Sequence, residues 1–283
     1  SVGTSIGSTQ KWTNANSGDA ITVSSGNLNY SGFTSAGNSI TFSGSGAESF
    51  TPFTSTTTGT IFASFIVSVT DIANITADPS VTYFAGLTDG TTGGYNARLF
   101  FNRVGTQYQF GFDSASTTTN YDATLRNVGD VVFVVMGYDF NTNTLNAWIN
   151  PDLTTFSETT PATLTVTPTT APTAFGGFIF RQDAAATTPT IVADELRIGT
   201  TVSQLLAVSQ NAIKGLAVYP NPATHGVLFV ETAANAERTI AIYDVLGKNV
   251  LNTTTSSSEV NISTLKGGVY IVKITEEGKT ATR

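Results

Sequence analysis

Cysteine is absent from the sequence, and histidine occurs once, as His225. The absence of cysteine excludes disulfides, thiol catalysis and cysteine-based metal sites. A single histidine excludes most histidine-based zinc sites and argues against a histidine-containing catalytic triad. The fold must therefore be held together by its hydrophobic cores, and any site chemistry must come from other side chains.

Charged residues are also scarce, at 12% of the chain. The net charge of −7 is uneven: residues 1–212 hold six Lys or Arg against fourteen Asp or Glu, which gives −8, and residues 213–283 hold seven against six, which gives +1. No basic stripe is present to neutralise phosphates, which excludes a nucleic-acid partner. No run approaches the roughly 20 apolar residues of a membrane helix, so we expect no transmembrane segment.

Abundant Ser, Thr, Asn and Gly take the place of charged residues, and this mixture favours β structure. At 283 residues the chain is long enough for two domains. It opens with Ser1 and without a basic-then-apolar leader, so we interpret it as a mature or trimmed chain.

Residues 1–204 show apolar side chains that alternate with period two. In TIFASFIVSV the odd positions from Ile61 to Val69 are apolar, while Ser64 and Ser68 lie opposite. Long helical patterns are absent, and strands at this spacing predict an antiparallel jelly-roll β sandwich. Two hairpins are expected, with turns at residues 104–106 and 141–143.

Two stretches of this region resemble parts of laminin-G-like, concanavalin-A-like jelly rolls. VVFVVMGYDFNTNTLNAWINPD is similar to their strand–turn–strand unit, and VADELRIGT is similar to their closing strand. The resemblance covers about residues 10 to 200 and implies a two-sheet β sandwich, but no single function, because this fold hosts lectins, glycosidases and spacers. We expect this passenger domain to span residues 1–204 and a linker to span 205–213, although SQLLAVSQNAIKG also fits a short helix.

Acidic residues offer the candidate metal and catalytic chemistry of this domain. Asp194 and Glu195 are adjacent in a strand and face opposite ways, which excludes a catalytic pair on one face. Asp194 shares parity with Leu196 and Ile198, so we interpret it as an inward carboxylate bonded to a neighbouring loop, with a calcium ligand as the alternative. No other cofactor is implied. Retaining glycosidases of this fold carry acids two apart on one strand, and their absence here predicts that the domain is not an enzyme.

Aromatic residues offer a glycan-binding surface. Trp12, Tyr95, Tyr121 and Trp148 could form a platform on which sugars stack, although aromatic residues in sandwiches are more often core. Trp148 alternates away from its apolar neighbours and is the first residue to test for glycan stacking. Ser114 lies in an Asp-Ser-Ala motif that resembles the O-glycosylation site of Bacteroidetes surface proteins.

The stretch from residue 213 predicts a small Ig-like sandwich of about seven short strands. Pro220 and Pro222 lack a backbone N–H and fix φ, so YPNP forces a turn that joins no strand ladder. Gly247 stands where DVLGK needs a positive φ. Period-two strands follow in GVLFVET, TIAIYD, KNVLNT and GVYIVKIT.

Five landmarks stand in order in this stretch: YPNP, Gly226 before a strand, IYDVLGK, ISTLKGGVYIVKI and EGKTATR. Together they resemble the type A C-terminal sorting domain of the Type IX secretion system of Bacteroidetes, over residues 214–283. The resemblance implies that the secretion signal is carried by Tyr219, Pro220, Asn221, Pro222, Gly226, Asp244, Gly247, Lys248, Leu265, Gly268, Val269, Tyr270, Lys273, Gly278 and Lys279.

The sequence as a whole therefore predicts a two-domain secreted cargo. The resemblance implies export through the periplasm and the Type IX translocon at the outer membrane, followed by release or by attachment to the cell surface. We expect the N-terminal domain to bind glycans or surfaces, as an adhesin does. A secreted carbohydrate-active enzyme and a structural spacer without ligand remain as alternatives.

Overall fold

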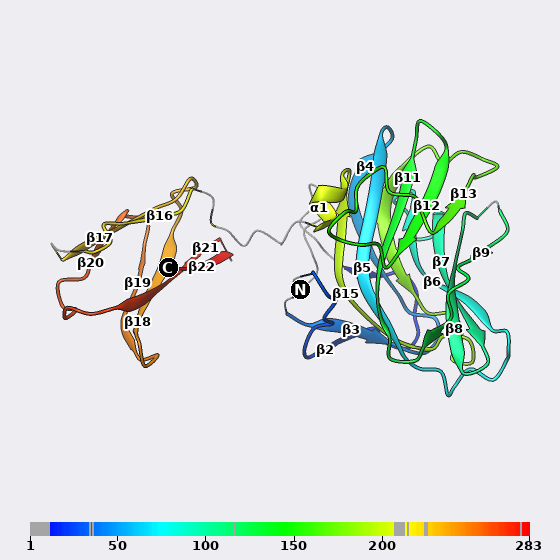
Figure 1. Ribbon diagram of the computed structural model, residues 1–283, viewed down its shortest axis with the longest axis horizontal. Coiled ribbons are helices and arrows are strands. Elements are labelled where there is room, and N and C mark those ends of the chain that lie inside the picture. Colours follow the sequence, from blue (N-terminus) through cyan, green and yellow to red (C-terminus); the bar gives the residue numbers. More distant parts are fainter. Residues whose placement is uncertain are drawn as a thin grey trace. The chain divides into compact units, whose positions relative to one another are not determined.

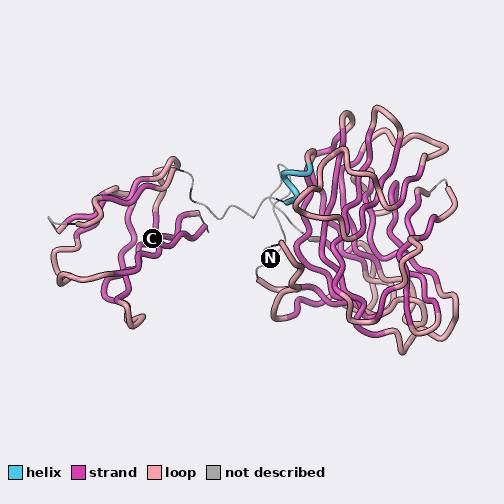
Figure 2. The backbone as a smooth tube through the Cα atoms, in the orientation of Figure 1, coloured by secondary structure: helices cyan, strands magenta, loops and turns pink. Residues whose placement is uncertain are grey.

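The chain divides into two compact units, Ser1–Val208 and Ser209–Arg283 (Figure 1). The computed structural model describes residues 12–33, 35, 37–115, 117–206, 213, 215–223, 226–277 and 279–283. Strands dominate both units, and the described residues contain a single short helix (Figure 2). This confirms the all-β fold class that the period-two alternation predicts.

The first sheet of the N-terminal unit is antiparallel and has eight strands. Its order is β1 (Thr13–Asn14), β4 (Glu48–Thr56), β14 (Phe175–Arg181), β6 (Val81–Thr88), β7 (Tyr95–Val104), β8 (Gln107–Asp113) and β10 (Arg126–Asn127), with β9 (Asn120–Tyr121) also paired to β8.

The second sheet has seven strands and is also antiparallel. Its order is β13 (Leu164–Val166), β12 (Thr144–Ile149), β11 (Val131–Asp139), β5 (Thr60–Asp71), β15 (Thr190–Gly199), β3 (Ser39–Phe42) and β2 (Thr22–Ser24). The two predicted hairpins are present, as β7–β8 and β11–β12.

The main core lies between the inner faces of these two sheets. Phe65 on β5 meets Phe178 and Phe180 on β14, with ring centres 5.6 and 5.5 Å apart. Edge-to-face contacts of this kind add to the stabilisation from burial, which makes the aromatic content of the chain part of its fold. The arrangement is the two-sheet sandwich that the sequence predicts.

A second core covers the outer face of the seven-stranded sheet. Phe62 and Ile66 on β5 and Phe133 on β11 pack there against loop residue Phe156 and against helix α1 (Val202–Leu206). Strands β5 and β11 are thus buried on both faces, which explains their nearly continuous apolar runs. Ser64 and Ser68, predicted to lie opposite the apolar positions, do so but are buried as well.

Helix α1 lies partly in the segment that the sequence predicts to be a linker, residues 205–213. Leu205 and Leu206 were expected in a linker, but they belong to the helix, and Leu205 is fully buried in the second core. The short-helix alternative is therefore correct for these two residues. Most of the predicted linker, residues 207–212, lies outside the described residues.

The C-terminal unit contains two antiparallel sheets around a core of its own. The core joins Leu228 and Val230 of one sheet to Ile240, Ile242 and Ile274 of the other, as in a small sandwich. The strands are β16 (Ala217–Tyr219), β17 (Val227–Glu231) and β20 (Glu259–Asn261) in one sheet and β19 (Asn249–Thr255), β18 (Arg238–Asp244), β21 (Tyr270–Glu276) and β22 (Lys279–Thr282) in the other.

Candidate functional sites

The outer face of the eight-stranded sheet carries a cluster of aromatic and charged side chains. On its strands Phe84, Leu99 and Phe180 point into the main core, so strand alternation directs their neighbours to the opposite face. We call this cluster the aromatic–arginine face; it consists of Glu48, Tyr83, Tyr95, Arg98, Phe100, Asp113 and Arg181.

Tyr83 lies at the centre of this face. The guanidinium carbon of Arg181 is 4.0 Å from its ring centre, and that of Arg98 is 5.3 Å away. The rings of Tyr95 and Phe100 stand 5.3 and 5.5 Å from Tyr83 at steep angles. Cation–π contacts fix all of these groups relative to one another before any ligand arrives.

Glycines on neighbouring strands leave room for some of the aromatic rings of this sheet. A Cβ at Gly86 would lie 3.6 Å from the Tyr95 ring, and a Cβ at Gly111 would lie 2.8 Å from the ring of Tyr121. These rings therefore lie close against the backbone instead of standing away from the sheet. A side chain at Gly111 would push Tyr121 aside.

Ion pairs tie the charged members of the face together. Arg98 donates two hydrogen bonds to Asp113, at 2.8 and 3.2 Å. Arg181 lies 3.1 Å from Glu48 and 2.5 Å from Asp183. The acids Glu48 and Asp113 are buried, whereas both arginine side chains are partly exposed. Such charge-assisted pairs hold the guanidinium planes in fixed orientations.

Glu48 also accepts a hydrogen bond from the Tyr95 hydroxyl, at 2.9 Å. Burial raises the pKa of the Tyr95 phenol well above its ordinary range, and the nearby Glu48 carboxylate raises it further. Burial raises the pKa of Glu48 as well. The proton therefore stays on Tyr95 at neutral pH, and the hydroxyl acts as a donor.

Trp148, the predicted stacking residue, is enclosed in the second core. It is only 5% exposed, and its ring packs against Phe62 and Phe156 with centres 5.9 and 5.6 Å away. Its Nε1 donates to the carbonyl of Thr160 at 2.8 Å. A ring enclosed in this way cannot lie against a sugar, so the prediction for Trp148 is corrected. Strand alternation assigned its face correctly but could not show that loops cover that face.

The other aromatic residues of the predicted platform are separated in the fold. Tyr95 belongs to the aromatic–arginine face, and Tyr121 lies beside it on β9 at 37% exposure. Trp12 stacks on Phe180, with ring centres 5.9 Å apart. The sequence therefore indicated two of the aromatic residues at this surface, but not Tyr83 or its arginines.

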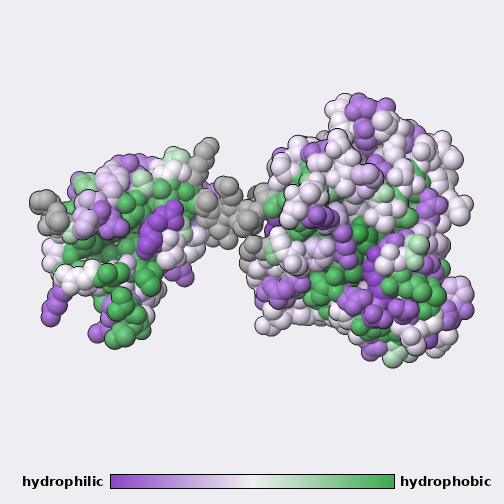
Figure 3. Space-filling view, in the orientation of Figure 1, coloured by the Kyte–Doolittle hydropathy of each residue, from purple (hydrophilic) through white to green (hydrophobic). Residues whose placement is uncertain are grey.

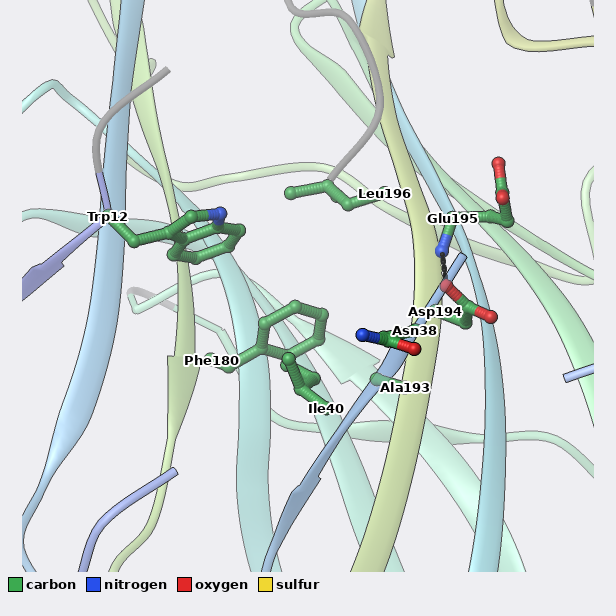
Figure 4. A pocket seen from close by; sticks show the side chains of 8 residues that line it. All are labelled: Trp12, Asn38, Ile40, Phe180, Ala193, Asp194, Glu195 and Leu196. Atoms are coloured by element: carbon green, nitrogen blue, oxygen red, sulfur yellow. Dashed lines mark hydrogen bonds between the residues drawn. The ribbon is translucent and has the colours of Figure 1, made fainter. Parts of the chain in front are cut away.

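Asp194 lines a small pocket beside Trp12 and Phe180, with a volume of about 30 Å³ (Figure 4). This is room for about one water molecule, too little for a sugar. The Asp194 carboxylate accepts hydrogen bonds from the backbone of Leu28 at 2.9 Å and of Glu195 at 2.8 Å. The predicted bond to a neighbouring loop is confirmed.

The predicted parity of Asp194 is wrong, because β15 contains a bulge. Glu195 has a φ of 54°, and the register shifts between Asp194 and Arg197. Leu196 therefore faces the main core, whereas Asp194 faces the Leu28 loop. The described residues include no group of three or more His, Asp or Glu side chains that could hold a metal. The calcium role of Asp194 stays a prediction.

Ser114, the candidate glycosylation site, directly follows the last strand residue of β8 and is 2% exposed. Its hydroxyl oxygen lies 3.3 Å from that of Thr117, and its backbone N–H donates to Thr117 Oγ1 at 3.1 Å. An attached glycan would require this loop to open, or attachment before folding. Modification of Ser114 stays a prediction.

The C-terminal unit contains a groove of about 910 Å³. One wall is the turn after β16, and the other is the segment that leads from Ile262 into β21. The two walls are joined by a backbone hydrogen bond of 2.8 Å from Ile262 to Gly226. The predicted signal residues that line the groove are Pro220, Asn221, Pro222, Gly226, Leu265, Gly268, Val269 and Tyr270.

Gly226 is required at this junction for two reasons. Its φ is 71°, a conformation that other residues rarely adopt, and an added Cβ would lie 3.1 Å from the Cβ of Ser263. Tyr270 closes the other wall, because its hydroxyl donates to the carbonyl of Lys266 at 2.9 Å. Residues as far apart in sequence as Pro220 and Tyr270 thus form one concave surface.

The IYDVLGK landmark forms the tight turn between β18 and β19. Asp244 accepts hydrogen bonds from the backbone of Leu246 and Lys248, both at 3.0 Å, and Gly247 has a φ of 82°. The turn leaves Val245 and Leu246 exposed at 70% and 91%. Figure 3 shows apolar side chains at the tip of this unit where Figure 1 places the β18–β19 hairpin.

The remaining predicted signal residues do not line the groove. Tyr219 stacks on Phe229, with ring centres 5.3 Å apart, and donates a hydrogen bond to Glu231. Lys273 and Lys279 are exposed on β21 and β22. Gly278, like His225, lies outside the described residues.

Residues 217–283 match the family model described as a secretion system C-terminal sorting domain. These residues are a type IX sorting domain. The sorting domain marks proteins that are exported and then attached to or released at the cell surface, so the chain is a secreted cargo handled by the type IX machinery. None of the helices in the described part of the chain is long and apolar enough to span a membrane.

A search of the curated proteins found no match to the chain. Among solved structures, a pentraxin from Limulus polyphemus is 9% identical, with 57% of this chain and 73% of that one covered and a TM-score of 0.36. A botulinum neurotoxin serotype D binding domain in complex with N-acetylneuraminic acid is 9% identical, with 98% and 68% covered and a TM-score of 0.43. An alginate lyase from Pseudomonas aeruginosa is 12% identical, with 54% and 73% covered and a TM-score of 0.38. Likenesses this weak carry no inference about function.

Proposed function

We propose that the N-terminal unit binds glycans through the aromatic–arginine face and that the sorting domain delivers this binding module to the cell surface. The observation that carries the proposal is the cluster around Tyr83, where aromatic rings on β6 and β7 lie beside fixed hydrogen-bonding groups from β4, β7, β8 and β14. Sugar rings present C–H groups to aromatic surfaces and hydroxyls to polar side chains. The face offers both kinds of contact within a few ångströms.

The same residues favour binding over hydrolysis. Glycoside hydrolysis needs one carboxylic acid and one carboxylate free to act on the scissile bond. Glu48 is engaged by Arg181 and Tyr95, and Asp113 is engaged by Arg98 and Thr119. Acids engaged in this way are positioning groups, so we propose a module without enzymatic activity.

Binding is tested by applying the purified full chain and a Tyr83→Ala variant to a glycan array. The variant loses the central ring and is expected to bind about tenfold or more weakly, which corresponds to about 1.4 kcal/mol. Tyr219→Ala, which removes a partly exposed ring from the sorting domain, is the matched control and should bind like the parent chain. Glycan cleavage would favour the enzyme alternative, and absence of any binding would favour the spacer.

We further propose that the groove of the sorting domain contacts the secretion machinery. Its support is that landmarks from both ends of the domain converge on one concave, largely apolar surface. Val269 is 76% exposed at this surface, so Val269→Asp should leave the fold intact while placing a charge in the contact. Export is expected to fall about tenfold or more by quantitative blotting of surface and medium fractions. Thr280→Asp, on an exposed residue outside the groove, should be exported normally.

A further inference from the structure

We infer that the aromatic–arginine face selects neutral glycans and rejects acidic ones. The inference rests on the proposed glycan binding and names the class of glycan. Its basis is the state of the arginines before any ligand arrives: each cation of the face already has an acidic partner.

The two arginines of the face are paired with three acids. Arg98 is held by Asp113, and Arg181 is held by Glu48 and by Asp183. Two positive and three negative charges leave a local balance of −1. The Asp183 side chain is 46% exposed, so a negative group is presented to an approaching ligand.

The remaining arginines of the described N-terminal residues are engaged as well. Arg126 pairs with Asp122, and Arg197 pairs with Glu195. Arg103 donates to the backbone carbonyls of Gly105 and Ile75. Lys11 lies outside the described residues. Every arginine of the described N-terminal residues other than Arg103 therefore already has an acidic partner.

An acidic sugar could bind only at a cost. To replace the existing partner of Arg98, its carboxylate would have to displace Asp113, and to take Arg181 fully it would have to displace the exposed Asp183 and also Glu48; the Glu48 and Asp113 side chains are 5% and 2% exposed. A displaced acid would stay buried without a partner, which is strongly unfavourable. In addition, residues 1–212 carry a net charge of −8, which repels polyanions at low salt.

A neutral sugar meets none of these penalties. A hydroxyl both donates and accepts, so it can bridge a guanidinium N–H and a carboxylate oxygen without breaking their pair. Arg98 uses Nε and one terminal nitrogen for Asp113, and its other terminal nitrogen makes no hydrogen bond within the described residues. This nitrogen can donate to a sugar hydroxyl beside the ring of Tyr83, whereas a carboxylate bound there would lie next to Asp113, whose negative charge already balances the guanidinium.

The test uses the full chain and pairs of oligosaccharides that differ only at C6, as a hydroxymethyl group in the neutral member and a carboxylate in the acidic one. Array screening identifies the bound linkage, and calorimetry then compares the two members. We expect the neutral member to bind at least tenfold more tightly, with little dependence on salt. Equal or tighter binding of the acidic member would overturn the selectivity while leaving glycan binding in place.

A double variant tests the converse prediction, which is a gain of affinity for the acidic glycan. Glu48→Gln combined with Asp183→Asn leaves Arg181 without an acidic partner and should raise affinity for the acidic member at least fivefold. Asp183→Asn alone, on an exposed residue, gives a smaller gain in the same direction if the double variant fails to fold. An unchanged acidic affinity in a folded variant would contradict the inference. Failure of every glycan of either class to bind would instead overturn the proposed function itself.

Discussion

At the scale of single residues, the sorting domain depends on a buried cation that its sequence motifs do not indicate. Arg238 is 1% exposed and donates to the carbonyl of Val230 at 2.8 Å and to the side chain of Asn235 at 2.9 Å. Its Nε lies 3.7 Å from Glu276, which is also buried. Because Val230 belongs to one sheet and Glu276 to the other, this side chain links the two halves of the sandwich.

Replacement of Arg238 by Met should destabilise the sorting domain by about 3–5 kcal/mol, because Glu276 would be left buried without its cation. Urea denaturation of the full chain, monitored through a spectroscopic signal of the sorting domain, measures this loss of unfolding free energy. Adding Glu276→Gln to the variant should recover part of it. If the single variant is as stable as the parent, the contacts of Arg238 do not stabilise the sorting domain.

A second prediction at this scale concerns alkaline pH. Burial raises the pKa of the Tyr108 phenol from the ordinary 10 to about 12. The unfolded chain therefore releases this proton first, so the stability contributed below pH 10 is lost as the pH rises towards 12. The melting temperature of the parent chain should fall as the pH is raised from 8 to about 12, and that of the Tyr108→Phe variant should fall less steeply. A parallel decline in both proteins would exclude Tyr108 as a cause.

Individual residues also show what the period-two alternation of apolar side chains could not predict. The pattern around Asp194 fixes a strand, but only the backbone reveals the bulge at Glu195, because nothing in DELRIG requires a positive φ at a glutamate. Tyr83 likewise follows ordinary alternation, and its importance emerges only when Arg98 and Arg181 arrive from other strands. Contacts between strands depend on their order in the sheet, which the sequence does not state.

At the scale of elements, the seven-stranded sheet is covered on its outer face by loops and by α1. Trp148 on β12 is the largest side chain of the second core beneath that cover, so its removal should act on stability and not on a ligand. Trp148→Ala is expected to cost about 3–5 kcal/mol, and Trp148→Phe less, by urea denaturation. Folded Trp148→Ala protein should keep the glycan binding of the parent. Loss of binding at full stability would restore the stacking hypothesis.

The elements of the sorting domain were easier to predict than their function-bearing surface. Proline and glycine positions identify its turns, and period two identifies its strands, because both rules act locally. The groove arises between two turns that are distant in sequence, so the landmarks indicated its residues without indicating that they share one surface.

At the scale of the whole molecule, the chain divides into the N-terminal unit, which is the proposed binding module, and the unit that holds the sorting domain. Each unit has its own hydrophobic core. Removal of residues 213–283 is therefore expected to leave the N-terminal unit folded and to trap it in the periplasm. Cell fractionation and the melting temperature of the purified fragment test the two parts of this prediction. Normal export of the truncated chain would contradict the role of the sorting domain.

The burial of β5 and β11 on both faces has a consequence for how the N-terminal unit unfolds. Their backbone amides are paired on both sides within the sheet and shielded above and below by side chains, so no local fluctuation brings them to water. Exchange of these amides with deuterium should require global unfolding, whereas those of β1 and β2 at the sheet edges should exchange through small openings. The exchange rates of the slowest backbone amides in the N-terminal unit would then measure its free energy of global unfolding.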